Sequence, residues 1–197
     1  LSRVIALAAK IHVRNIEFSA ANAITLDNVD NAIDKIVLNG ESTGDVKVYS
    51  KAENGLTVDG DFKTAGNVAI NSSKATLTMT GDLTADKAIT LTASGDLKDK
   101  STSLIKGGEQ ISMTATNVLL KGEVASPEVV VTTGKGLDMQ NADNAIDKLA
   151  VGTSSGNRIN GSVIVTTNAD EFIAVFKNNV YRDITLTNKK SGGGPVG

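Results

Sequence analysis

The sequence predicts an all-β fold, a right-handed parallel β-helix with about 20 to 22 residues in each turn, here called a coil. Three observations predict it. Apolar pairs separated by one residue recur, over the first six pairs, at steps of about 18 to 22 residues. A triplet of Gly, an acidic residue and an apolar residue recurs between them. Aromatic residues make up only 3% of the chain, which suits a narrow interior filled by Val, Ile, Leu and Met.

The apolar pairs indicate strands, because residues i and i+2 of a strand point to the same face. The first series is Ile24/Leu26, Val46/Val48, Val68/Ile70, Ile89/Leu91, Ile111/Met113 and Val129/Val131, and it continues at Leu149/Val151, Val163/Val165 and Ile184/Leu186. A second series is Leu56/Val58, Leu77/Met79, Val118/Leu120 and Leu137/Met139. One period of roughly 20 residues therefore holds about three short strands.

The segments between the strands are rich in turn residues. The recurring triplets are Gly60-Asp61-Phe62, Gly81-Asp82-Leu83, Gly95-Asp96-Leu97 and Gly122-Glu123-Val124. Alternate strand positions carry threonine, at Thr90, Thr92, Thr114 and Thr132, which we expect to face outward. The alternative fold is a β-sandwich, because Asn39-Gly40 and Asn54-Gly55 are typical of type I′ hairpins.

The longest internal echo is Asn28–Ile36, which returns much later in the chain as Asn141–Leu149. Five coils of about 22 to 23 residues are expected to account for this separation. Asp30 and Asp34 are expected to cap a short helical turn, since aspartate at the start of a helix accepts free backbone N–H groups.

The chain divides into three parts. Residues 1–20 are predicted to be an N-terminal cap or a preceding coil, with helix in the first half and strand in the second. Residues 21–190 are the β-helix repeats, and 191–197, with Gly192-Gly193-Gly194, are a flexible tail. Phe172, Phe176 and Tyr181 predict a terminal cap or packing patch.

Composition argues against several classes of function. The 20 basic and 22 acidic residues are mixed along the chain, so no basic stripe favours nucleic acid. The chain has no cysteine, and its single histidine, His12, cannot form a histidine-based metal cluster. We expect His12 to be a packed or exposed residue near the end. Sequence motifs for phosphate, dinucleotide, hydrolase or zinc-peptidase sites do not occur, and no membrane span or cofactor is predicted.

Acidic residues are the remaining candidates for chemistry. They gather at Asp27, Asp30, Asp34, at Asp143, Asp147, and at Asp59, Asp61. Oxygen ligands at alternate positions can hold Ca²⁺, but the loops match no EF-hand, and a structural turn is the favoured interpretation. Paired carboxyls also serve glycosidases, and Asp59 and Asp61 are the pair to test. The arginines, Arg3, Arg14, Arg158 and Arg182, are scattered. The sequence therefore predicts no catalytic, cofactor or metal site.

Residues 45–135 resemble the filamentous-haemagglutinin family of large secreted bacterial adhesins. The stretches that carry the resemblance are Gly81-Asp82-Leu83-Thr84-Ala85, Ala88-Ile89-Thr90-Leu91-Thr92-Ala93-Ser94-Gly95-Asp96-Leu97 and Gly107-Gly108-Glu109-Gln110-Ile111-Ser112-Met113-Thr114-Ala115. The resemblance implies two-partner secretion, a long β-helical stalk and no catalytic residue in the repeats. The duplicated Asp-Asn-Ala-Ile-Asp-Lys is not part of that family's pattern.

The sequence thus predicts a structural and adhesive segment of a secreted protein at a bacterial cell surface. Its expected partner is a glycan or protein on a host or neighbouring cell. One alternative is a subunit of an extracellular filament, in which residues 4–18 are a strand donated to a neighbour. A second alternative is a polysaccharide-active β-helix enzyme.

Overall fold

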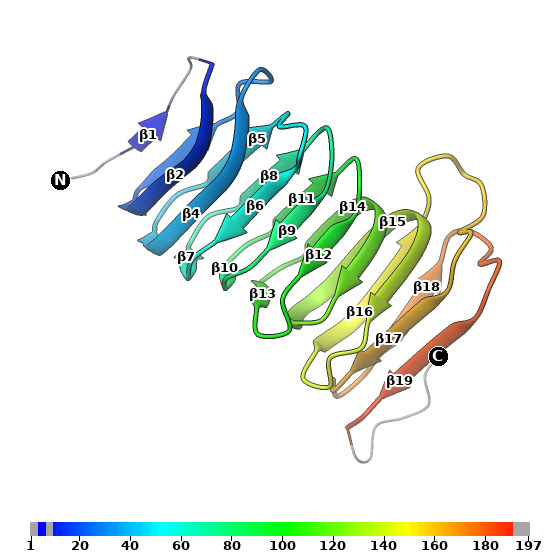
Figure 1. The fold of residues 1–197 in the computed structure, drawn as a ribbon. Coiled ribbons are helices and arrows are strands. Elements are labelled where there is room, and N and C mark those ends of the chain that lie inside the picture. Colours follow the sequence, from blue (N-terminus) through cyan, green and yellow to red (C-terminus); the bar gives the residue numbers. More distant parts are fainter. Residues whose placement is uncertain (1–3, 7–9, 191–197) are drawn as a thin grey trace.

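Residues 4–6 and 10–190, which the computed structural model describes, form a β-solenoid of about eight coils (Figure 1). Their secondary structure is strand, bridge and turn, without a helix and so without one that could cross a bilayer. The strand pairings between successive coils are parallel. The predicted parallel β-helix is therefore confirmed. The β-sandwich is wrong, because its hairpins would require antiparallel pairs.

The strands stack into three ladders, one for each side of the coil. The first face contains β1 (Val4–Ala6), β3 (Ala23–Leu26), β5 (Val46–Ser50), β8 (Val68–Ser72), β11 (Ile89–Ala93), the start of β14 (Ile111–Leu120), the middle of β15 (Glu123–Met139), the end of β16 (Ala145–Gly152) and β18 (Ile173–Phe176). The second face contains β2 (His12–Ala21), β4 (Ala32–Ser42), β6 (Leu56–Asp59), β9 (Leu77–Met79), β12 (Leu97–Asp99), the ends of β14 and β15, β17 (Val163–Thr167) and β19 (Ile184–Asn188). The third face contains the ends of β2 and β4, β7 (Phe62–Thr64), β10 (Leu83–Ala85), β13 (Leu104–Gly107) and the starts of β15 and β16.

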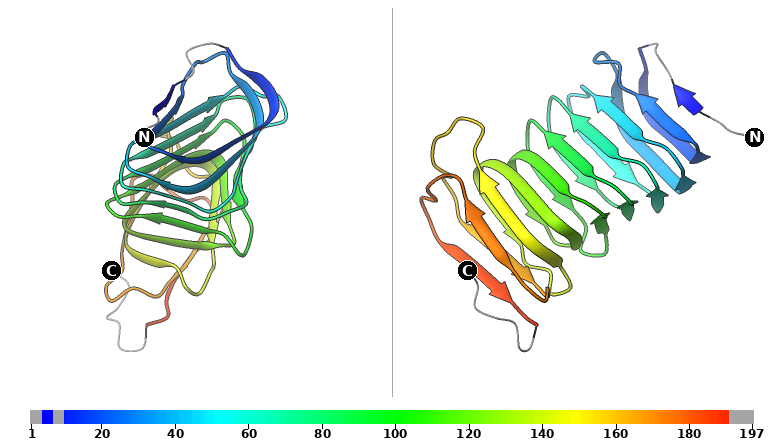
Figure 2. Two further views of the ribbon diagram at one scale, coloured as in Figure 1. Left: turned by 90° about the vertical axis from the view of Figure 1, so that its left-hand side faces the viewer. Right: turned by 180° about the vertical axis from the view of Figure 1, so that it is seen from behind.

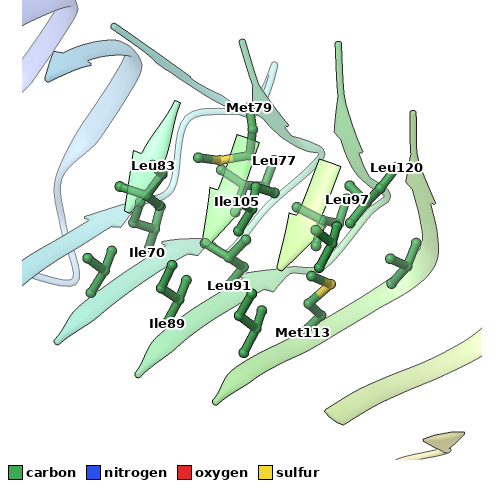
Figure 3. Close-up of a cluster of buried hydrophobic side chains, with 14 of the residues drawn as sticks. Ile70, Leu77, Met79, Leu83, Ile89, Leu91, Leu97, Ile105, Met113 and Leu120 are labelled. Carbon is green, nitrogen blue, oxygen red and sulfur yellow. The ribbon is translucent and has the colours of Figure 1, made fainter. Parts of the chain in front are cut away.

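The core is the inside of the coil, where apolar side chains from all three faces meet. In Figure 3, Leu91 and Met113 of the first face lie inside the coil together with Leu97 of the second and Ile105 of the third. Each of these four side chains is at most 1% exposed. The predicted outward threonines alternate with these positions and are exposed or half-buried. The period-2 pattern therefore predicts the core correctly.

The structure corrects the predicted positions of the last apolar pairs and of the Asn-Gly dipeptides. Val163 pairs with Leu137 and Ile184 pairs with Val163, so the last two apolar pairs of the first series lie on the second face. Asn39-Gly40 lies within β4, where the chain passes from the second face to the third, and Asn54-Gly55 lies at the corner between β5 and β6. The φ angles of Gly40 and Gly55 are 82° and 95°. A positive φ suits a hairpin and a solenoid corner equally, which explains the incorrect hairpin prediction.

The duplicated motif forms a reverse turn. The Asn31 N–H donates to the Asn28 carbonyl at 3.0 Å, and the Asp30 N–H donates to Asn28 Oδ1 at 2.9 Å. The Asn144 N–H likewise donates to the Asn141 carbonyl at 3.4 Å. The prediction that Asp30 and Asp34 cap a helical turn is therefore wrong, because strand β4 follows directly.

The separation between the two copies of the motif is longer than five coils. Ile24 and Val129 lie on one ladder, five pairings apart. Leu137 precedes the second copy at the position where Ile24 precedes the first, and Leu137 already lies on the second face. The same local structure therefore occurs at two different corners of the coil.

The secondary structure at the ends of the stack differs in part from the prediction. Val4–Ala6 is a strand, so the helix predicted for the first half of residues 1–20 is wrong there, and β2 pairs in parallel with β4. At the other end, Phe172 is buried, Phe176 is half-buried and Tyr181 is 68% exposed, so the three rings are not buried together. Figure 2 shows β19 at the edge of the stack. The predicted tail, 191–197, lies outside the described residues.

Candidate functional site

The acidic candidates are separated on the outside of the coil. Asp30 pairs with Lys51, and Asp59 pairs with Lys35. Of the others, Asp34 is half-buried, and the exposed ones are Asp27, Asp61, Asp143 and Asp147. Within residues 4–6 and 10–190, no three His, Asp or Glu side chains gather closely enough to hold a metal ion. His12 is exposed on β2.

Asp59 forms an ion pair and further hydrogen bonds that lower its pKa. Lys35 Nζ lies 2.6 Å from its Oδ2. The hydrogen bond from Lys35, followed by those from Thr80 and the Gly60 N–H, lowers the pKa of Asp59 to about 2. A glycosidase needs one carboxyl whose pKa is raised, so that it can donate a proton at neutral pH. Asp59 is shifted in the opposite direction and is a poor general acid.

Removal of Lys35 is expected to change the pH dependence of stability. Because the folded-state pKa of Asp59 is below its ordinary value of 3.8, the ion pair stabilises the fold above about pH 4, and this contribution disappears as the pH falls through about 2. Lys35→Met should lower the free energy of unfolding at pH 7 by about 0.5 kcal/mol. Urea denaturation at pH 7 and pH 2 measures the difference. Lys63→Met, an exposed lysine on β7, is the control, and an equal loss at both pH values would contradict the assignment.

Each duplicated motif contains a buried asparagine, Asn31 in the first copy and Asn144 in the second, that the apolar pattern does not predict. Asn144 Nδ2 donates to the carbonyls of Met139 and Thr166 at 3.2 and 2.9 Å, and its Oδ1 accepts the Val124 N–H at 2.7 Å. These partners belong to three successive coils. The side chain therefore ties one coil to both neighbours.

Asn31 makes two of the same three bonds. Its Nδ2 donates to the Leu26 carbonyl at 3.0 Å, and its Oδ1 accepts the Ile11 N–H at 2.9 Å. Both asparagines are 0% exposed. The sequence does contain a signal for this role. An asparagine that is repeated just before an alternating apolar segment is typical of a turn in which the side chain hydrogen-bonds to the nearby backbone. The motif is therefore structural.

A hollow lined by hydroxyl groups opens on the outer surface. Its volume is about 270 Å³, and its lining residues are Ala93, Ser94, Thr114, Ala115, Thr116, Thr132, Thr133, Gly134 and Ser154. Thr116 Oγ1 donates to the Ser94 carbonyl at 2.9 Å, and Thr133 Oγ1 donates to the Thr116 carbonyl at 2.8 Å. These bonds hold successive coils together. The predicted outward residues Thr114 and Thr132 lie here and give the surface a neutral, hydrogen-bonding character.

The structure brings Arg158 and Tyr181, which are distant in the sequence, into contact. The guanidinium carbon of Arg158 lies 5.1 Å from the centre of the Tyr181 ring. The sequence predicts no role for Arg158 and predicts a terminal cap or packing patch that includes Tyr181. The two lie close to one coil apart in the sequence, so stacking makes them neighbours.

Comparisons of the chain with protein-family models, with curated proteins and with solved structures find no match. The resemblance to filamentous haemagglutinins therefore stays a prediction.

Proposed function

We propose that this chain is a rigid β-helical segment of a secreted bacterial surface protein and that it presents an adhesive outer surface. The observation that carries the proposal is the unbroken core. The first-face positions Val46, Val68, Ile89, Ile111, Val129 and Leu149 are each 0 or 1% exposed. A hinge requires a coil that is poorly packed against its neighbour, and the packing along this column is continuous.

The outer surface supports attachment better than catalysis. Two of the candidate carboxylates, Asp59 and Asp30, are paired with lysines. The hydroxyl-lined hollow offers donors and acceptors to a polar partner such as a glycan. Weak sites of this kind become effective when many copies act together on one surface.

A bead assay tests the proposal. Beads that carry many copies of the chain are expected to attach to epithelial or bacterial cells more than beads coated with albumin. Treatment of the cells with glycosidases or with proteases then tells a glycan partner from a protein partner. Attachment no greater than that of albumin-coated beads would contradict the adhesive role.

The second candidate is a filament subunit, and the last coil favours it. Ile184, on β19, is 48% exposed, whereas Val163, its partner one coil earlier, is 0% exposed. Among the described residues, no strand pairs with the outer edge of β19. A second copy would cover this edge and its apolar positions. Sedimentation at rising concentration should then show growing species that Ile184→Lys suppresses, while a stalk segment stays at one size.

A further inference from the structure

One coil of the solenoid carries an insertion. Leu149 pairs with Ala174 on the next coil, a longer step along the chain than the pairings of Ile24 with Val46 or of Ile89 with Ile111. The extra residues lie in the segment 153–160, which projects from the stack between β16 and β17 (Figure 1). In solenoid proteins, an insertion in one repeat maps to a surface loop, often on the binding face.

The inserted loop borders an open hollow against the next coil. The hollow measures about 330 Å³ and is lined by Gly156, Asn157, Arg158, Asn179, Val180 and Tyr181. Two backbone hydrogen bonds of 2.8 Å join this loop to the next coil, from the Ile159 N–H to the Asn179 carbonyl and from the Tyr181 N–H to the Ile159 carbonyl. Ile159 itself is 0% exposed, so the loop is anchored in the core. This volume is at the lower end of the range for small-ligand sites.

Two lining side chains give the hollow a specific chemistry. The Arg158 guanidinium lies against the Tyr181 ring, which remains 68% exposed. Arg158 forms neither an ion pair nor a hydrogen bond with any residue in the part of the chain that the structure describes. One small hollow is therefore lined by an exposed ring, a cation without a carboxylate partner and two asparagines, Asn157 and Asn179.

We propose that this hollow binds an acidic sugar residue, a pyranose that carries a carboxylate, such as a uronic acid or a sialic acid. The guanidinium pairs with a planar carboxylate through two parallel hydrogen bonds. The aromatic ring offers a flat apolar surface to the C–H face of the pyranose, and the amides bond its hydroxyls. A neutral sugar leaves the charge of Arg158 unpaired and binds more weakly. This site rests on the proposed adhesive function and names its ligand class.

NMR titration of the intact ¹⁵N-labelled chain tests the site. The probes are methyl β-glucuronide, methyl α-sialoside and, as a neutral control, methyl β-glucoside. A carboxylated sugar is expected to shift the amides of residues 156–158 and 179–181, with a Kd at least tenfold lower than that of the glucoside. Arg158→Met should raise this Kd at least tenfold. Arg14→Met, an exposed arginine on β2 at the other end of the stack, removes the same charge and should leave the Kd unchanged.

The outcomes of these experiments distinguish a sugar-binding site from a contact that only stabilises the fold. If neither acid shifts these amides, or if Arg158→Met and Arg14→Met bind equally well, the proposal is wrong, and the Arg158–Tyr181 contact only joins neighbouring coils. If only the glucuronide or only the sialoside binds, that result identifies the kind of acidic sugar that the site recognises. Beads carrying Arg158→Met distinguish the site from the wider function: equal attachment of variant and wild-type beads shows that adhesion does not depend on this site. Absence of attachment by wild-type beads, with the titration positive, refutes the adhesive role alone.

Discussion

Replacement of Asn144 by leucine is expected to lower the free energy of unfolding by about 3 to 5 kcal/mol. Leucine has a similar volume, so the change removes hydrogen bonds without opening a large cavity. The buried Val124 N–H and the carbonyls of Met139 and Thr166 lose the partner that Asn144 supplies. Each buried polar group left without a partner costs about 1 to 3 kcal/mol. Urea denaturation followed by circular dichroism measures the loss.

Asn31→Leu is the matched variant for this prediction. Asn31 holds two bonds of the same kind, to Leu26 and Ile11, so its loss should be smaller than that of Asn144→Leu. An exposed asparagine, Asn160, replaced by alanine should change stability by less than about 0.5 kcal/mol. If Asn144→Leu were as stable as the wild type, the bridging role of the buried amide would be wrong.

Replacement of Gly81 by alanine is expected to lower the free energy of unfolding by about 2 to 3 kcal/mol. A Cβ atom at Gly81 would lie 2.0 Å from the Gly60 carbonyl oxygen and 2.6 Å from the Gly60 nitrogen. Both contacts are backbone atoms of the preceding coil, so no side chain can move aside. The two coils must separate locally, and the hydrogen bond from the Phe62 N–H to the Asp82 carbonyl, 2.8 Å long, lies at this point.

Gly134→Ala is the control for Gly81→Ala. No heavy atom lies within 4 Å of a Cβ built at Gly134, and its φ is not in the left-handed region. We expect its melting temperature to stay within about 2 °C of the wild type, because surface changes away from packed contacts are nearly neutral. Equal melting temperatures for the two variants would contradict the close approach of neighbouring coils at this corner.

The core of this fold could be predicted from the sequence because burial imposes a simple rule. A side chain that points inward must be apolar and must recur at every second residue of a strand, which is why Ile89 and Leu91 marked their face correctly. The near-constant steps then indicated stacked coils. The three faces are chemically alike, however, so the pattern did not assign Val163 and Ile184 to the right one.

The corners were harder to predict because hairpin turns and solenoid corners can require the same backbone conformation. Gly40 adopts a positive φ at a solenoid corner, as it would in a hairpin. The short amide of Asn144 suits a turn, but its bonds to three coils depend on which residues the stacking places beside it. Local sequence does not contain that information.

The candidate sugar site could not be predicted from the sequence for a related reason. Arg158 and Tyr181 become neighbours only when their coils stack, and which residues face each other is not visible until the register of the stacked coils is known. An isolated arginine and an exposed tyrosine are unremarkable by themselves. Their contact beside a hollow makes them a candidate.

The most direct test of the rigid stack is a pair of distances measured by electron paramagnetic resonance between spin labels on the first face. Lys47, Val130 and Val175 occupy one outward row, in which Val130 lies four coils and Val175 six coils from Lys47. Labels at 47 and 130 should be about 19 Å apart and labels at 47 and 175 about 29 Å apart, since each coil adds about 4.8 Å. Both distributions should be narrow, as a rigid stalk requires. Distances that do not grow with the number of coils would contradict the solenoid, and broad distributions would contradict its role as a rigid stalk.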